Sequence, residues 1–92
     1  MKSRSVMLLK EILMSETWQK IDNTLVKTFQ FSGFSEAVDF VNKVADLANK
    51  EDHHPDIEIF SYKFVKIKLT THCEGSKVTA KDYKLKELID QL

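Results

Sequence analysis

The chain has 92 residues, of which 42% are hydrophobic and 30% are charged, and its 14 basic and 14 acidic side chains cancel at neutral pH. This length fits a single domain with one core, and the absence of net charge excludes the basic footprint of a direct nucleic-acid binder or of a protein that binds anionic membranes. Two glycines and one proline argue against a disordered or low-complexity chain.

The first predicted element is a short helix over residues 5–15, because Leu8, Leu9, Ile12 and Leu13 recur at helical spacing. Two β-prone runs follow, TWQKI and LVKTFQF, and the Asp-Asn pair between them is typical of a tight turn. We therefore expect a β-hairpin after the first helix.

The second strand of this hairpin places Leu25, Phe29 and Phe31 on one face, as expected for side chains that pack against a core. Lys27 shares that face with them. A cation in this position weakens the expectation that the strand is fully buried.

The clearest helix in the sequence follows the segment SGFS, in which Ser35 is the candidate N-cap. The helix must end before Pro55, because a proline drives the preceding residue out of the helical conformation. His53 and His54 are therefore expected at or just beyond its last turn. Its apolar stripe, suited to packing on a sheet, consists of Phe34, Ala37, Val38, Val41, Val44, Ala45 and Ala48.

Two more β-prone runs, IEIFSY and KFVKIKLTTH, come next, and the second alternates cleanly between apolar and basic residues. Its Val65, Ile67 and Leu69 share one face, which indicates a half-buried strand. The segment TAKD then predicts a capping box at the start of a last helix, with Thr79 as the N-cap and Asp82 three residues later. The apolar stripe of that helix consists of Leu85, Leu88, Ile89 and Leu92.

The order of the elements is α-β-β-α-β-β-α. Strands that are joined by short turns pair in antiparallel fashion, and helices with one apolar stripe each cover one face of a sheet. We therefore predict an α+β fold of two layers, a four-stranded antiparallel sheet with three helices on one face, formed by residues 1–92 as a single domain.

The single cysteine, Cys73, cannot form an intrachain disulfide, so the sequence favours the interior of the cell. The apolar run over residues 6–9 is shorter than a signal-peptide core and is followed by Lys10 and Glu11. No transmembrane run is present. We predict a cytoplasmic protein, with the nucleus as an option and the mitochondrion as a weaker one, suggested by the basic, serine-containing start.

The three histidines are the main candidates for chemistry. Three histidines in a chain of this length are also compatible with ordinary solvated residues. However, a helix C-terminus and Asp52 both favour a protonated imidazole at His53 or His54. Two adjacent imidazoles in a partly desolvated site cannot both be charged comfortably, so one is expected to act as an acid and its neighbour as a base.

A zinc site is a competing hypothesis, since three histidines can hold a catalytic metal. Adjacent residues point in different directions, however, so His53 and His54 would not easily reach one tetrahedral ion. Cys73 beside His72 suggests a nucleophile, but a thiol without an oriented base is more often inert. We predict no metal.

These residues resemble the motif of the pterin-4a-carbinolamine dehydratases. The family pattern is a charged residue or His four positions before His-His-Pro, then an aromatic residue five or six positions on, a His nine further and an Asp eight to fifteen further. The similarity extends from Trp18 through TFQFSGFSEAVDFVNKVADLA to the C-terminal helix. The matching residues are His53, His54, Pro55, Tyr62, His72 and Asp82.

The resemblance implies the same fold and the dehydration of a 4a-hydroxytetrahydropterin to the quinonoid dihydropterin, a step in tetrahydrobiopterin recycling that needs no cofactor. By this analogy, His53 and His72 flank the C4a hydroxyl and N5 of the pterin, and His54 is a second acid/base or an orienting group. Asp82 is equally compatible with helix capping. The implied substrate-binding residues are Asp52, Pro55, Ile57, Thr70, Thr71 and Asp82.

Two departures from the family pattern concern the shape of the pocket. Asn49 stands four residues before His53, where the family usually has a Glu or another charged residue. The turn from His72 to Asp82 is one residue longer than is common and has Lys77 and Val78 in place of Gly and Leu.

The resemblance also implies partners. Members of the family look like homodimers or homotetramers, so the resemblance implies a homo-oligomer here. The run LVKTFQF is a candidate edge strand for that pairing. Some resemble a dimerisation cofactor of a homeodomain transcription factor. A transcription-factor partner and a binding protein without catalytic activity therefore remain alternatives, and Asn49 is the best argument for the latter.

Overall fold

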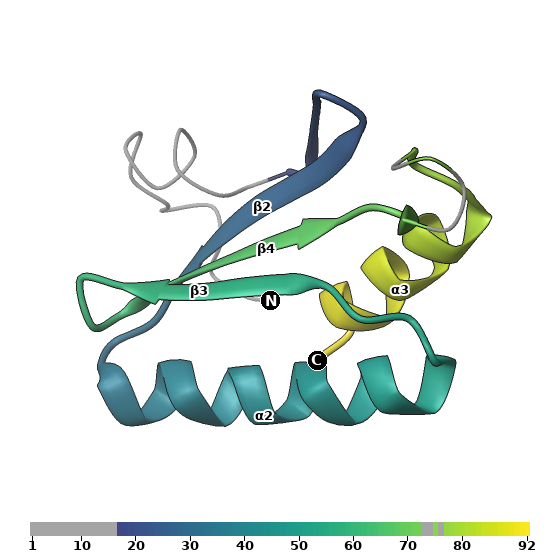
Figure 1. Cartoon of the computed structure of the whole chain (residues 1–92). Coiled ribbons are helices and arrows are strands. Elements are labelled where there is room, and N and C mark those ends of the chain that lie inside the picture. Colours follow the sequence, from purple (N-terminus) through teal and green to yellow (C-terminus); the bar gives the residue numbers. More distant parts are fainter. Residues whose placement is uncertain (1–16, 73–74, 76) are drawn as a thin grey trace.

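The computed structural model describes residues 17–72, 75 and 77–92, which form one antiparallel sheet and two helices (Figure 1). The strand order in the sheet is β1-β2-β4-β3. The α+β class and the four-stranded antiparallel sheet are confirmed, whereas the predicted helix over residues 5–15 lies outside the described residues. The elements are β1 (Gln19–Ile21), β2 (Thr24–Gln30), α2 (Phe34–Glu51), β3 (Asp56–Phe60), β4 (Phe64–Leu69) and α3 (Ala80–Asp90).

Both hairpins turn through two residues with positive φ. The β1–β2 turn uses Asp22 at φ 52° and Asn23 at φ 60°, and the β3–β4 turn uses Ser61 at φ 46° and Tyr62 at φ 55°. In the two-residue β1–β2 turn, left-handed backbone at both central positions matches the right-handed twist of the flanking strands, whereas the β3–β4 turn has a third residue, Lys63. The predicted hairpin around the Asp-Asn pair is confirmed.

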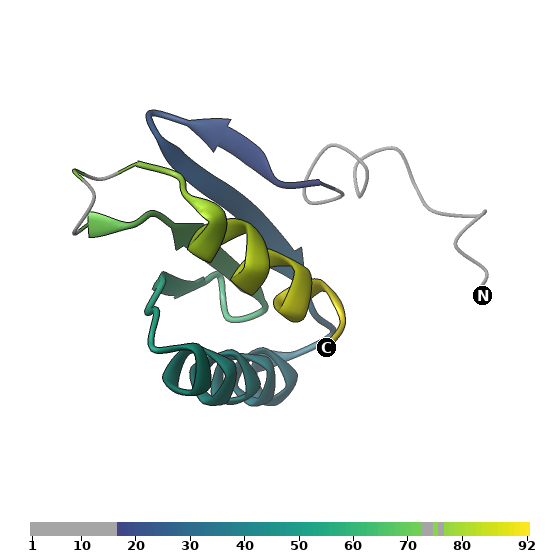
Figure 2. The same cartoon turned by 90° about the vertical axis from the view of Figure 1, so that its right-hand side faces the viewer.

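The core lies between one face of the sheet and the two helices, which pack on that same face (Figures 1 and 2). The register pairs Leu25 of β2 with Leu69 of β4 and Ile67 of β4 with Ile57 of β3, so the apolar alternation of neighbouring strands is in phase. The predicted inward face of β4 is confirmed. The buried apolar residues are Leu25, Ala37, Val44, Ala48, Val65, Ile67, Leu69, Leu85 and Ile89.

Helix α2 begins two residues earlier than its sequence suggests. The N-cap is Gly33 rather than Ser35, because the backbone N–H of Ala37 already donates to the Gly33 carbonyl at 3.2 Å and no side chain caps the helix. Two of the predicted stripe residues are exposed. Phe34, at the first helical position, is 56% exposed, and Leu92, beyond the end of α3, is 49% exposed. At both positions the apolar stripe continues past the sheet that it covers.

Strand β2 is not the edge strand that its sequence suggested, because it lies between β1 and β4. The edges of the sheet are β3 and the short β1. Since β1 pairs only with residues 24–26, the remainder of β2 has one side without a strand partner among the described residues.

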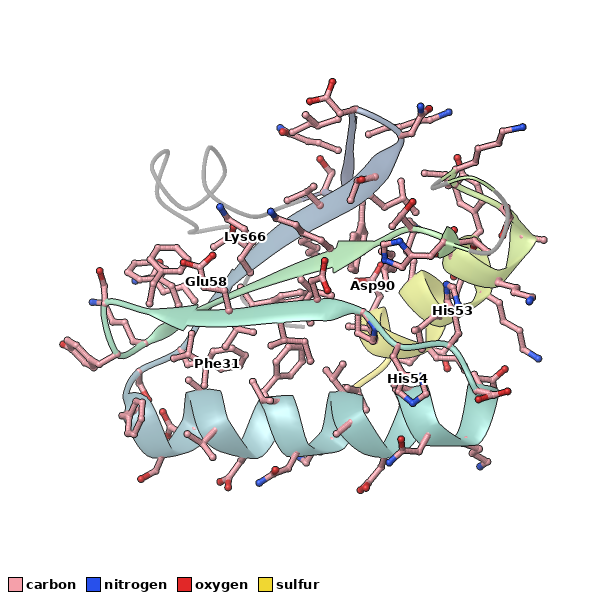
Figure 3. The ribbon with its side chains drawn as sticks, viewed as in Figure 1. Phe31, His53, His54, Glu58, Lys66 and Asp90 are labelled. Carbon is pink, nitrogen blue, oxygen red and sulfur yellow. The ribbon has the colours of Figure 1, made fainter. Side chains whose placement is uncertain are left out.

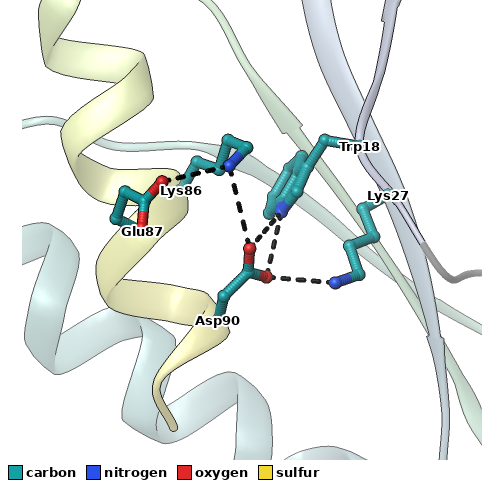
Figure 4. A network of polar contacts seen from close by, with 5 residues as sticks. All are labelled: Trp18, Lys27, Lys86, Glu87 and Asp90. Carbon is teal, nitrogen blue, oxygen red and sulfur yellow. Dashed lines mark hydrogen bonds and ion pairs between the residues drawn. The ribbon is translucent and has the colours of Figure 1, made fainter.

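The position of Lys27 on the helix-facing side of β2 is explained by its contact with Asp90, at the end of α3 (Figure 4). The Lys27 Nζ donates to Asp90 Oδ1 at 3.0 Å, and the Trp18 indole N–H donates to both carboxylate oxygens at 3.0 and 3.1 Å. Lys86 lies 3.9 Å from the same carboxylate. The Lys27 ammonium also sits 4.8 Å from the centre of the Phe29 ring. This network joins α3 to the first two strands.

Replacing Asp90 with alanine is expected to lower the free energy of unfolding by about 1.5 kcal/mol, because three donors lose a charged acceptor that is only partly exposed. Glu87→Ala is the matched control on the same helix, since among the described residues the Glu87 carboxylate pairs with Lys86 alone, at 3.4 Å, and it should cost less than about 0.5 kcal/mol. Urea unfolding measures both variants. Equal losses would show that the Asp90 network does not stabilise the packing of α3.

Candidate active site

The three histidines line one open hollow of about 260 Å³ at the edge of the fold. Its wall comes from three segments: the connection from α2 to β3, the residues after β4, and the first turn of α3. Residues that are as many as 29 positions apart in the sequence therefore meet here. The lining residues are Asp52, His53, His54, Thr70, Thr71, His72 and Lys81.

The C-terminus of α2 fixes the backbone of His53. Asp52 adopts a left-handed conformation at φ 52° and ψ 44°, which turns the chain sharply out of the helix. The N–H of Asp52 donates to the Asn49 carbonyl at 3.3 Å, and the N–H of His53 donates to the Ala48 carbonyl at 3.1 Å. This pair of bonds is the Schellman arrangement. The predicted end of the helix before Pro55 is confirmed.

A short bridge beyond β4 positions the second wall of the hollow. Thr71 pairs with Lys77 in an isolated antiparallel bridge, and the N–H of Thr71 donates to the Lys77 carbonyl at 2.9 Å. Thr70 is also held, since its hydroxyl donates to the Asn23 carbonyl at 2.9 Å. His72 follows directly, so the bridge sets where its backbone enters the hollow.

Asp82 is fully buried, and its carboxylate serves both the helix and the histidine. Oδ2 accepts the backbone N–H of Thr79 at 2.9 Å and the hydroxyl of Thr71 at 2.7 Å, which confirms the predicted capping box. Oδ1 lies 2.6 Å from Nε2 of His53, whose side chain is 11% exposed. Of the two roles that the sequence left open for Asp82, helix capping is confirmed. Asp82 does not line the hollow but contacts His53, and its binding of substrate stays a prediction.

The environment of Asp82 favours its ionised form. Burial by itself raises the pKa of the Asp82 carboxyl, but the hydrogen bonds from His53, the Thr79 N–H and the Thr71 hydroxyl together hold this pKa below its usual range. Asp82 therefore carries its negative charge at neutral pH, and it lies against the imidazole of His53.

The two adjacent histidines point to different partners. Figure 3 shows His53 beside α3 and His54 above the last turns of α2. Nε2 of His54 lies 3.0 Å from Oδ1 of Asn49. An amide oxygen can only accept, so Nε2 of His54 is the donor. The residue that departs from the family pattern thus holds the second imidazole through a neutral acceptor.

Some residues of the motif or of the predicted substrate-binding set do not line the hollow, Asp82 among them. Ile57 packs against the core, and Tyr62 is 60% exposed at the tip of the β3–β4 hairpin. Pro55 does not line the hollow either. Thr71 lines it but is 1% exposed, so its hydroxyl serves Asp82. Val78, where the family has Leu, packs against the core as a leucine would.

Sequence reasoning missed Lys81, which is the one lysine or arginine among the described residues that line the hollow. Its place directly before Asp82 in the capping box was a usable signal, because that segment was already expected to approach the histidines.

Neither a metal centre nor a membrane span is found in the part of the chain that the structure describes. Among residues 17–72, 75 and 77–92, no three His, Cys, Asp or Glu side chains are arranged to hold one ion. Within the same residues, no helix has the length and apolar character needed to cross a bilayer. Cys73, the other candidate nucleophile, lies outside the described residues.

Comparison with known proteins gives a consistent result. The family model for pterin 4 alpha carbinolamine dehydratase matches residues 4–92. A protein of Picosynechococcus provisionally named pterin-4-alpha-carbinolamine dehydratase is 51% identical over 75 residues, which cover 82% of this chain and 79% of that protein. A protein of Sulfolobus acidocaldarius with the same provisional name is 43% identical over 77 residues, covering 84% and 82%.

Two solved structures share the fold. A transcriptional coactivator/pterin dehydratase from Brucella melitensis superposes with a TM-score of 0.75 at 32% identity and covers 89% of this chain and 87% of its own. A pterin dehydratase-like protein identified as a RuBisCO assembly factor in the alpha-carboxysome superposes with a TM-score of 0.64 at 22% identity, with coverage of 84% and 87%. The second likeness concerns the fold alone.

Proposed function

Because the chain belongs to the pterin 4 alpha carbinolamine dehydratase family, we propose that it dehydrates a 4a-hydroxytetrahydropterin to the quinonoid dihydropterin by histidine acid/base catalysis. The observation that carries this proposal is the convergence of His53, His54 and His72 on one hollow, with the Asp82 carboxylate beneath His53. An array of imidazoles is suited to proton transfer near neutral pH.

The reaction requires one acid and one base. The C4a hydroxyl is a poor leaving group until it is protonated, and the proton on N5 must leave as the new C=N bond forms. The proton that the base takes from N5 balances the proton that the acid gives to the hydroxyl, so the net products are the quinonoid dihydropterin and one water. Positioned groups with a pKa near the ambient pH contribute roughly 10²–10⁴-fold each to such transfers.

The side chains of the hollow divide into proton carriers and binding groups. His53 and His72 are assigned to the C4a hydroxyl and N5, and they enter from different segments of the chain. His54, which is held by Asn49, orients the ring or acts as a second carrier. Asp52 is exposed at the rim and can accept hydrogen bonds from N–H groups of the pterin. Thr70 can also act only as an acceptor toward the substrate, because its hydroxyl proton is donated to the Asn23 carbonyl.

The wider assignment follows from the family. The proposed process is tetrahydrobiopterin recycling in the cytoplasm by a homo-oligomer, with no cofactor beyond the pterin substrate. Pro55 and Ile57, which do not line the hollow, are proposed to shape its floor through packing rather than through contact with the substrate.

A direct assay tests the proposed reaction. An aromatic amino-acid hydroxylase generates the 4a-hydroxytetrahydropterin in the cuvette, and the quinonoid dihydropterin is followed by its absorbance. The protein is expected to accelerate product formation roughly 10²-fold or more over the uncatalysed dehydration. No acceleration at micromolar protein would exclude the enzymatic function and favour a binding role.

The alternative function is that of a dehydratase-like binding protein or a transcriptional dimerisation cofactor. Asn49 favours this alternative, because a neutral amide stands where the family usually has a charged residue. The Asn49 side chain also accepts a hydrogen bond from His54. The Brucella protein carries both names, coactivator and dehydratase. Inactivity in the assay, together with an intact fold, is the result that this alternative predicts.

A further inference from the structure

The hydroxyl groups around Asp82 form a hydrogen-bond chain whose direction follows from counting protons. A carboxylate can only accept, so the Thr71 hydroxyl donates its single proton to Asp82 Oδ2 at 2.7 Å. The 2.7 Å bond between Thr71 and Thr79 must then be donated by Thr79. The Thr79 oxygen in turn accepts the backbone N–H of Lys81 at 3.3 Å. Every proton in the chain points toward Asp82.

The same count applies to the histidine. Asp82 Oδ1 lies 2.6 Å from Nε2 of His53 and has no proton to give, so Nε2 is the donor. In a neutral imidazole the other nitrogen is then unprotonated. In the imidazolium both nitrogens carry protons, and the one on Nε2 stays on Asp82.

We propose that the hydrogen-bond chain that caps α3 fixes His53 as the Nε2–H tautomer, that Nδ1 is the nitrogen through which His53 exchanges its proton, and that Thr71 and Thr79 are positioning residues acting through Asp82. The tautomer stands on the geometry alone, whereas its consequence for catalysis rests on the proposed function. The Asp82 carboxylate thus both caps α3 and orients the imidazole of His53.

Other charged and titratable groups line the hollow together with His53. Asp52 and His54 lie on the α2–β3 connection, His72 follows β4, and Lys81 lies in the first turn of α3. They do not compete for Nε2, which lies at hydrogen-bond distance from Asp82.

The replacement Asp82→Asn provides a sharp test because an amide has one acceptor and one donor side. Both Thr71 and the Thr79 N–H donate to the Oδ2 position, so the asparagine oxygen must face them. Its NH₂ group then faces His53, and Nε2 must become an acceptor. The helix cap is preserved while the tautomer of His53 inverts.

Nitrogen-15 NMR of the imidazole side chains reads the tautomer without any substrate. At a pH where His53 is neutral, the wild type is expected to show a protonated Nε2 and an unprotonated Nδ1, and Asp82→Asn the reverse. A wild-type protein with protonated Nδ1, or an Asp82→Asn variant that keeps the Nε2–H form, overturns the proposal. Because no turnover is measured, failure of the dehydratase function is distinguishable from failure of this inference.

Thr71→Val tests the positioning role with a replacement of nearly the same shape. With one donor removed, the Asp82 carboxylate should bind the imidazolium more strongly, so the NMR titration midpoint of His53 is expected to move to higher pH, and the pH profile of kcat with it. Thr71→Ser restores the hydroxyl and should return both toward the wild type. An unchanged midpoint in a folded Thr71→Val protein would overturn the positioning role of the two threonines.

Discussion

Replacing His53 with alanine is expected to lower kcat/KM for the 4a-hydroxytetrahydropterin by about 10²–10⁴-fold, the contribution typical of one positioned acid or base. The same loss is expected for His72→Ala, which approaches the substrate from the other wall of the hollow. The loss should fall mainly on kcat, because the imidazoles act on atoms whose charge changes in the transition state. The coupled hydroxylase assay measures it.

The matched control is Glu58→Ala on β3, whose side chain lies on the sheet face opposite the helices and outside the hollow. Its neighbours Ile57 and Ile59 pack against the core, so Glu58 points away from it. It should retain full activity. Because His53→Ala also removes a donor from Asp82, its unfolding must be measured alongside. Activity that survives both histidine replacements in folded protein would reject the acid/base assignment.

The features that the sequence predicts well are local ones. The alternation of Val65, Ile67 and Leu69 fixed the buried face of β4, because side chains of a strand alternate regardless of what covers it. The capping box of Thr79 and Asp82 was recognisable because both partners lie within one helical turn. Pro55 set the end of α2 through its steric effect on the preceding residue.

The features that were missed depend on contacts between distant segments. Asp82 and His53 are separated by 29 residues, and no local rule brings them together. Lys27 looked misplaced on an apolar face because its partner, Asp90, lies 63 residues away. The position of β2 inside the sheet also depends on strand order, which alternation does not determine. Convergence of the histidines was predicted by family resemblance and not by spacing.

Replacing Asp82 with alanine is expected to lower the free energy of unfolding by about 3 kcal/mol at pH 7, one of the largest effects available to a single substitution in this chain. The change removes the α3 cap, worth about 1 kcal/mol. It also leaves the buried Thr71 hydroxyl and the His53 Nε2–H without their acceptor, at about 1–3 kcal/mol for an unsatisfied buried group. Asp82→Asn is the control, since it keeps an acceptor for the cap and should lose less.

The pH dependence of this loss distinguishes the charge from the packing. The folded-state pKa of Asp82 is lowered by its hydrogen bonds against the opposing effect of burial, relative to an ordinary value of 3.8. A lowered pKa stabilises the fold above that ordinary value, and the stabilisation disappears as the pH falls through the folded pKa. The difference in unfolding free energy between wild type and Asp82→Ala, measured by urea titration, should therefore shrink as the pH falls below about 4. Other carboxylates titrate in both proteins and cancel in the difference. A gap that persists unchanged into strong acid would mean that Asp82 stabilises the fold through its shape and not through its charge.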